Sequence, residues 1–421
     1  MTKNIIISII FLIILIIYKI IQIKKYKAIY KEDLYKKSLK IIKISYLISV
    51  LLFITILVLN LINYGNDPSI KTTIEYIINA ISVAILALPL TIHNLYQSSF
   101  NQEEKISHKK TIITNEINEK LIRKFNKAGI NVVILTMKEP TIKIKTIKED
   151  EIDKKLLSKN IVIKTNNLKL IDNIVSKEKV LYAFDNPENA YNQIKEARGI
   201  HDNYIRTIKY NTITYLSLML SYVFLTLMSF PTSLNLSLVL LLKIFTIITS
   251  NFLYKNMPYD IDIMERKVKD KEIFIGRQEL LITIIASFSV FFFTTIPYMY
   301  TLSQDGTIEL ANTLFYIIFI YSNIFITYSL ISESNIIKNI FKSLTNIRLI
   351  IYTLSSIAFT ILLNFTTIFD TKNIYLKNYL SCILFAIFTI LFLELTKLAR
   401  FTTVKGTKKN ELKNNKKYKR S

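Results

Sequence analysis

The chain is poor in cysteine, tryptophan and glycine: its 421 residues include one cysteine, six glycines and no tryptophan. The single thiol, Cys382, excludes an internal disulfide framework. The glycines lie at least about thirty residues apart, which excludes a glycine-rich loop that cradles a phosphate. Three histidines and one cysteine, scattered along the chain, form no metal-ligand pattern, so we predict no metal site and no cofactor.

Long apolar runs are abundant, because 51% of the residues are hydrophobic. A helix that crosses a membrane needs about 20 mostly apolar residues. The segments that meet this length are 5–23, 44–63, 74–95, 210–230, 233–254, 279–301, 311–332, 347–368 and 376–397. The fold class that we predict is an α-helical polytopic membrane protein with about nine transmembrane helices, together with one small α/β cytoplasmic domain.

The net charge of +24 is concentrated in lysine-rich blocks between the apolar runs. This placement favours positive-inside topology over nucleic-acid binding. With nine spans, every basic block falls on one side of the membrane, which predicts an outside N-terminus and a cytoplasmic C-terminus. The first span lacks a small-residue cleavage site, so we interpret it as an uncleaved anchor. The bias to Ile, Lys and Asn is typical of AT-rich bacterial genomes and indicates a bacterial cell membrane.

One sizeable segment, residues 98–207, lies outside the predicted membrane spans. Within it, KAGINVVILTMKEP (127–140) is typical of a helix–turn–strand unit, with a strand at 131–135. The runs at 161–164 and 180–184 are predicted to pair beside that strand. A single long helix is expected to leave this domain and enter the membrane through residues 194–230. The predicted organisation is 1–23 anchor, 24–97 two helices, 98–207 cytoplasmic domain, 208–398 six helices and 399–421 basic disordered tail.

The order of these elements resembles the P-type cation-transporting ATPases, in their calcium-pump-like branch. Five stretches carry the resemblance, in the family's order: SVAILALPLTI (82–92), KAGINVVILT (127–136), IKEARGIHDNYIRTIKY (194–210), PYDIDIMERKVKDKE (258–272) and ANTLFYIIFIYSNIFITYSLISES (311–334). The resemblance implies that 24–97 corresponds to the family's third and fourth helices and 208–398 to its C-terminal helices. It also implies that 98–207 is a truncated phosphorylation domain.

The family's catalytic parts are missing from this sequence. The Asp-Lys-Thr-Gly-Thr motif with the phosphorylated aspartate is absent, and Asp153-Lys154 lies downstream of the strand without Thr-Gly-Thr. Where the family reads Gly-Asp after that strand, this chain reads Met137-Lys138. The actuator and nucleotide-binding domains are also missing. Since phosphoryl transfer needs a nucleophile, a magnesium site and phosphate clamps, we predict no ATPase activity.

The resemblance also implies an altered ion site, because the family's ligand positions align with hydrocarbon side chains such as Leu86, Val223 and Ile247. One aligned residue is charged: Lys243 lies in mid-span, where an ionisable side chain is a functional candidate by default. We predict that its ammonium replaces the ion and locks the helices in one conformation. The alternative is a lysine that is neutral or snorkels to the membrane edge. The predicted partners of Lys243 are Thr246, Ser217, Ser221 and Asn323.

Two functions from different classes follow. The first is a catalytically inactive membrane protein that acts as a regulatory or structural partner of another membrane protein, such as a complete P-type pump. The alternative is an ion transporter or transport subunit that works without its own ATP hydrolysis. A decayed paralogue is a third possibility. The partners predicted are the lipid bilayer and another membrane protein, with no nucleic acid.

Overall fold

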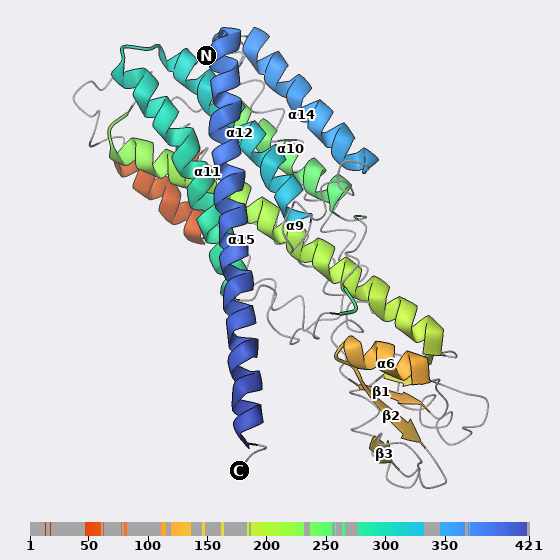
Figure 1. Cartoon of the computed structure of the whole chain (residues 1–421). Coiled ribbons are helices and arrows are strands. Elements are labelled where there is room, and N and C mark those ends of the chain that lie inside the picture. Colours follow the sequence, from red (N-terminus) through yellow and green to blue (C-terminus); the bar gives the residue numbers. More distant parts are fainter. Residues whose placement is uncertain are drawn as a thin grey trace. The chain divides into compact units, whose positions relative to one another are not determined.

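A computed structural model describes most of the chain after residue 187 and shorter pieces before it (Figure 1). The described residues are 13, 17, 47–59, 62, 77, 80–81, 111–114, 119–135, 145–147, 161–163, 183–184, 187–230, 236–254, 257, 263–265, 277–331, 346–366, 369 and 371–418. They divide into two compact units. The helical unit comprises 1–93, 206–254 and 276–421, and the α/β unit comprises 94–205 and 255–275.

The α/β unit contains a five-stranded sheet in the order β3-β2-β1-β4-β5. Its strands are β1 (Thr111–Thr114), β2 (Asn131–Leu135), β3 (Lys145–Ile147), β4 (Ile161–Ile163) and β5 (Ala183–Phe184). All four pairings are parallel. The chain places β2 and β3 on one side of β1 and then β4 and β5 on its other side, so the sheet is doubly wound. The switch point, where the direction of strand addition reverses, lies between β1 and β4.

The sheet confirms the strand at 131–135 and corrects its neighbours. The runs at 161–164 and 180–184 do contribute strands, but β4 pairs with β1 and β5 pairs with β4, so neither lies beside β2. The strand beside β2 on one side is β1, which the sequence analysis missed, and on the other side β3. These two strands are four and three residues long, and such short runs show too little alternation to be recognised.

Helix α6 (Glu119–Lys127) leads into β2 through the turn at Gly129. Gly129 has φ 71°, and its N–H donates to the Asn126 carbonyl while the Ile130 N–H donates to the Phe125 carbonyl. These two bonds form a Schellman motif, which satisfies carbonyls that a helix end leaves without partners. The apolar face of α6, with Ile122 and Phe125, packs in a buried core with residues of α9 (Pro187–Leu227) and with Ile263 and Met264.

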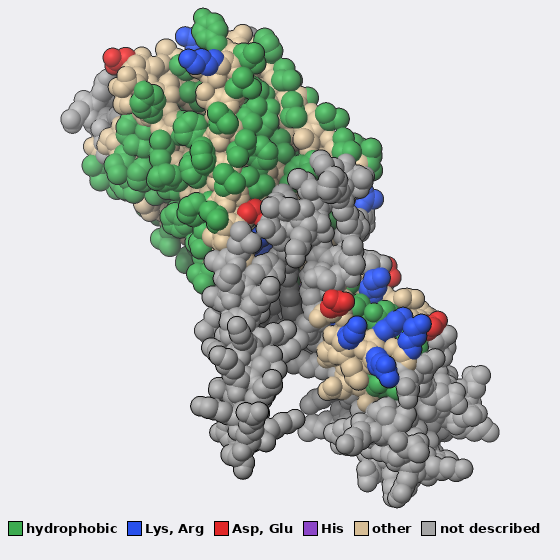
Figure 2. Space-filling model, viewed as in Figure 1, with side chains coloured by type: hydrophobic (Ala, Val, Ile, Leu, Met, Phe, Trp, Pro, Cys, Tyr) green, Lys and Arg blue, Asp and Glu red, His purple; other side chains and the backbone are tan. Residues whose placement is uncertain are grey.

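The helical unit contains the apolar helix Leu47–Leu59, the second half of α9 and, later in the described part of the chain, five further helices. They are α10 (Leu236–Leu253), α11 (Arg277–Ser303), α12 (Ile308–Leu330), α14 (Ile347–Phe365) and α15 (Leu376–Tyr418). Four of the segments are long and apolar enough to cross a membrane: Glu279–Ser303, Ile308–Leu330, Ile347–Phe365 and Leu376–Lys397. In Figure 2, hydrophobic side chains cover the visible face of this unit, as expected for a surface that contacts lipid tails.

These four segments agree with the predicted spans at 279–301, 311–332, 347–368 and 376–397. The predicted spans at 210–230 and 233–254 coincide with helices α9 and α10, and their crossing of a membrane stays a prediction. The expected long helix through 194–230 is α9, which is continuous over 41 residues. The predicted spans at 5–23 and 74–95 lie almost entirely outside the described residues, and the one at 44–63 is represented by an apolar helix, Leu47–Leu59. The total of nine spans therefore stays a prediction.

The C-terminal tail differs from the prediction. Residues 399–421 were expected to be disordered, whereas α15 continues past the predicted end of the last span to Tyr418 (Figure 1). From residue 399, the continuation is rich in Lys, Asn and Thr, with one Glu and one Leu, and it contains one glycine, Gly406, and no proline. Without a proline, every residue of this segment can donate its backbone N–H within the helix.

Candidate functional site

The predicted intramembrane lock centres on Lys243, which lies near the middle of α10 and is completely buried. Its ammonium lies 5.3 Å from the centroid of the Tyr215 ring, on α9. The Tyr215 hydroxyl donates to the Lys243 carbonyl at 3.5 Å. A cation over an aromatic face is attracted by the negative charge of the ring face, and the attraction is stronger when water is excluded. The Lys243 side chain therefore lies in the interior of the helical unit, against α9.

The four predicted partners lie in the same bundle, with contacts of their own. Thr246 and Ser217 donate to carbonyls of their own helices, those of Leu242 and Thr214. Ser221 donates to the Ser217 carbonyl and accepts a bond from Thr295 at 3.0 Å. Asn323 accepts a bond from Thr214 at 2.7 Å through Oδ1 and donates to the Phe319 carbonyl through Nδ2. One contact of the Lys243 ammonium is with the ring of Tyr215, which the sequence analysis did not name.

Helix α9 is the hub of the polar contacts in the helical unit. Its Tyr210 hydroxyl lies 3.3 Å from the hydroxyl of Tyr352 on α14, and Thr214 and Ser221 bond to α12 and α11. The Tyr215 contacts join α9 to α10. Polar side chains that bond across helices substitute for the water that is absent between membrane helices. The interior thus holds α9 against four neighbours.

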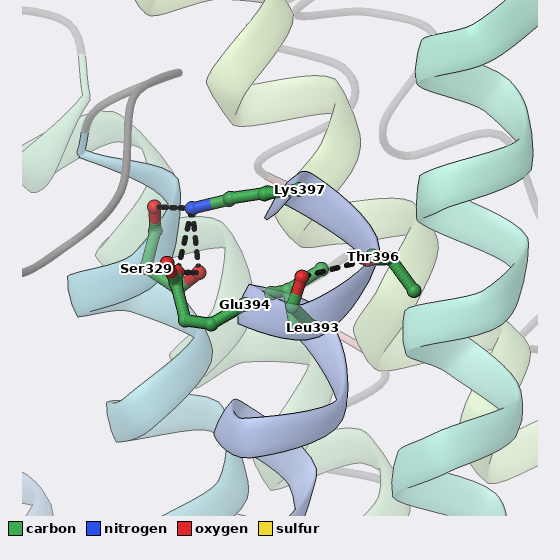
Figure 3. Close-up of polar contacts among 5 residues, drawn as sticks. All are labelled: Ser329, Leu393, Glu394, Thr396 and Lys397. Carbon is green, nitrogen blue, oxygen red and sulfur yellow. Dashed lines mark hydrogen bonds and ion pairs between the residues drawn. The ribbon is translucent and has the colours of Figure 1, made fainter. Parts of the chain in front are cut away.

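A second buried site joins α12 and α15, and the sequence analysis missed it (Figure 3). Lys397 Nζ donates to Glu394 Oε1 at 2.8 Å and to Ser329 Oγ at 2.7 Å. It also donates to the Ser329 carbonyl at 2.5 Å. The Ser329 hydroxyl in turn donates to Glu394 Oε1 at 2.5 Å. All three residues are buried. The detectable pattern was a Glu and a Lys three residues apart at the end of an apolar span.

Another buried ion pair joins α9 and α11. Lys209 Nζ lies 3.9 Å from Glu279 Oε2, with both side chains less than one-tenth exposed. Together with Glu394 and Lys397, this pair gives the bundle more buried charge than the sequence analysis expected. Among the described residues, no group of three or more His, Cys, Asp and Glu side chains is arranged to hold a metal ion.

In the α/β unit, Arg198 ties α9 to the turn after α6. Its Nη2 donates to the Ala128 carbonyl at 2.8 Å, and its Nη1 donates to the Ile263 carbonyl at 3.4 Å. Burial lowers the pKa of Arg198 below its usual value, while Asp202 and Tyr191 act in the opposite direction. The guanidinium binds a carbonyl at the C-terminal end of α6, where a cation is favoured by the helix dipole.

Comparison with known proteins agrees with the architecture of the second half of the chain. Residues 231–399 match a family model described as "Cation transporting ATPase, C-terminus". Two of the five stretches that carry the resemblance, 258–272 and 311–334, lie inside this match. No curated protein matches the chain. Residues 231–399 therefore relate this chain to the P-type cation-transporting ATPases, with the C-terminal membrane region of that family as the matched part.

Proposed function

We propose that the chain is a catalytically inactive relative of the cation pumps that acts as a regulatory or structural partner of another membrane protein. The observation that carries the proposal is the position of Lys243. Its side chain is fully buried in mid-helix against the Tyr215 ring, so its ammonium form places a positive charge in the interior of the bundle. A fixed internal cation repels a metal cation that would enter the same region.

The absence of catalytic motifs supports the same proposal. In a doubly wound sheet, the residues that follow the strands at the switch point are the usual place for ligands and chemistry. Here β1 is followed by Asn115 and Glu116, and β4 is followed by Lys164 and Thr165. Neither sequence contains an aspartate nucleophile with phosphate-binding neighbours. ATP-dependent, acid-stable phosphorylation of the purified chain would contradict catalytic inactivity.

A basic face on α6 is the contact surface that we propose for the partner. Lys120, Arg123, Lys124 and Lys127 are exposed and share one side of the helix, opposite the buried Ile122, Phe125 and Ala128. Figure 2 shows Lys and Arg side chains gathered on the visible face of the α/β unit. Such a face fits an acidic protein surface. The basic C-terminal tail is the second proposed contact.

The location that we propose is a cell membrane, with the N-terminus outside and the α/β unit and C-terminus in the cytoplasm. The apolar helices support a membrane location, and the distribution of lysines between the predicted spans supports this orientation.

The experiment is crosslinking in native membranes followed by affinity purification of the full chain. We expect one stoichiometric membrane partner, and loss of that partner with Lys124→Glu and Lys127→Glu combined. The matched control is Lys377→Glu, an exposed lysine on α15, which should retain the partner. Recovery of the chain alone, with cation flux in liposomes carrying the purified chain, would instead support the transport alternative.

A further inference from the structure

The Ser329–Glu394–Lys397 site satisfies its cation completely. An ammonium group has three N–H donors and no acceptor. Lys397 directs them to three oxygen atoms: Ser329 O, Ser329 Oγ and Glu394 Oε1. A buried charge is tolerated only when such partners replace its hydration, and Glu394 supplies the opposite charge. The three contacts also fix the position of the Lys397 side chain relative to α12.

The carbonyl in this site lies at a helix end. Helix α12 ends at Leu330, so the Ser329 carbonyl is one of the last four, which lack partners within their own helix. Lys397 reaches it from another helix, which caps α12 and places a positive charge at the negative end of the helix dipole. The C-terminal end of α12 therefore depends on the position of α15.

A second set of polar contacts joins α15 to α12 and α14, nearer the N-terminal end of α15. The Tyr379 hydroxyl lies 2.9 Å from the Tyr321 hydroxyl of α12 and 2.6 Å from the Thr360 hydroxyl of α14. Between Tyr379 and the Glu394–Lys397 pair, Phe388 stacks on Phe293 of α11, and Cys382 is 2% exposed. Polar contacts at two positions along α15 fix both its rotation about its own axis and its position along that axis.

We propose that Ser329, Glu394 and Lys397 form a latch that locks α15 against α12. With the latch closed, α15 keeps one rotation and height, so its continuation to Tyr418 starts from a fixed position. Opening the latch frees the C-terminal part of α15 to rotate or slide and exposes residues that now face the bundle. The latch is a conformational control point for the tail, and it operates whether or not the chain binds a partner.

The reporter for this motion must lie in the C-terminal part of α15, and Leu393, which is 1% exposed and adjacent to Glu394, is a suitable position. The experiment measures the rate at which N-ethylmaleimide modifies the Leu393→Cys side chain in an otherwise full-length Cys382→Ser protein in detergent, which serves as the reference for every variant. We expect Lys397→Met to raise the rate by about tenfold or more, since it removes the cap and leaves Glu394 buried without its cation. The matched control is Lys377→Met, an exposed lysine on the same helix, for which we expect the reference rate.

Ser329→Ala provides a milder variant that keeps the Glu394–Lys397 pair and the capped carbonyl. We expect it to raise the labelling rate by a few-fold, since it removes the two hydrogen bonds of the Ser329 hydroxyl, to Lys397 and Glu394. Labelling of folded Lys397→Met at the reference rate, or an equal increase with Lys377→Met, would overturn the latch. If Lys397→Met does not fold, as judged by circular dichroism, Ser329→Ala decides: a faster rate supports the latch and the reference rate overturns it.

Discussion

Lys243 and Lys397 are both buried lysines of the helical unit, but the structure surrounds them differently. Lys397 lies near the inner end of the bundle predicted from loop charge, and three oxygen atoms receive its three N–H donors. Lys243 lies in mid-helix, and its ammonium faces the Tyr215 ring. The first arrangement offsets burial with a counter-charge and hydrogen bonds, while the second includes an aromatic face that attracts the cation. The position of Lys243 in mid-helix makes it the functional candidate of the two.

The largest effect that we expect in this comparison comes from Glu394→Gln, which leaves Lys397 buried without its counter-charge. Breaking one half of a buried pair destabilises by about 3–5 kcal/mol. Thermal unfolding of the purified full-length protein, followed by circular dichroism, measures this loss. Glu309→Gln, at an exposed glutamate of α12, is the control and should leave the midpoint unchanged.

The double variant Glu394→Gln and Lys397→Met sharpens this prediction. Removing both charges together is often close to neutral, because no unpaired charge stays buried. We therefore expect the double variant to be more stable than Glu394→Gln alone. Strictly additive losses would show that the two side chains do not act as a pair.

Arg198→Met tests whether capping a helix end from another element stabilises the α/β unit as well. Arg198 binds the Ala128 carbonyl just after α6, much as Lys397 binds the Ser329 carbonyl of α12. Hydrogen bonds that involve a charged group contribute about 1.5–3 kcal/mol, so we expect a loss of this size. Faster amide hydrogen exchange in α6 and β2 would report it, with Lys127→Met, at an exposed residue of α6, as the control. Unchanged exchange would argue against such capping.

Lys243→Met should have a smaller effect on stability and a clear effect on function. A buried cation–π contact contributes about 2 kcal/mol, so we expect the thermal midpoint to fall by a few degrees and partner binding to weaken. An unchanged midpoint with unchanged binding would remove the lock hypothesis. A higher midpoint with lost binding would instead show that Lys243 is kept for function against stability.

Substitutions of Tyr215 should have the smallest effects and separate its ring from its hydroxyl. Tyr215→Phe keeps the aromatic face and removes the hydroxyl that donates to the Lys243 carbonyl at 3.5 Å. Hydrogen bonds between membrane helices average about 0.6 kcal/mol, so we expect a barely measurable change in the midpoint. Tyr215→Leu removes the ring and should resemble Lys243→Met. If Phe and Leu are equally damaging, the ring is not the partner of Lys243.

The long apolar helices were predicted from the sequence, while two short strands of the sheet were not. The spans within α11, α12, α14 and the first part of α15 were predicted within a few residues, because an apolar run of sufficient length identifies a membrane helix by itself. The continuous helix α9 and the strand β2 were also predicted. The short strands β1 and β3 were not, because they are recognised only by the neighbours with which they pair.

The candidate site was predicted in part for a related reason. An ionisable residue within an apolar span identified Lys243, and burial confirmed its interior position. An aromatic partner, Tyr215, lies 28 residues away along the chain, and helical register alone does not identify it. The hydroxyls of Ser217 and Thr246 donate to carbonyls of their own helices, and their role as partners of Lys243 stays a prediction.

The sequence by itself determined the long membrane helices, the basic blocks between them and the absence of the pump's catalytic motifs. These properties depend on residue type and spacing along one segment. Only the tertiary structure decided which groups surround each buried charge. Ser329 and Glu394 are 65 residues apart, and they meet because α12 and α15 pack together. A buried charge takes its partners from whatever helix lies beside it, and that neighbour is a property of packing in three dimensions.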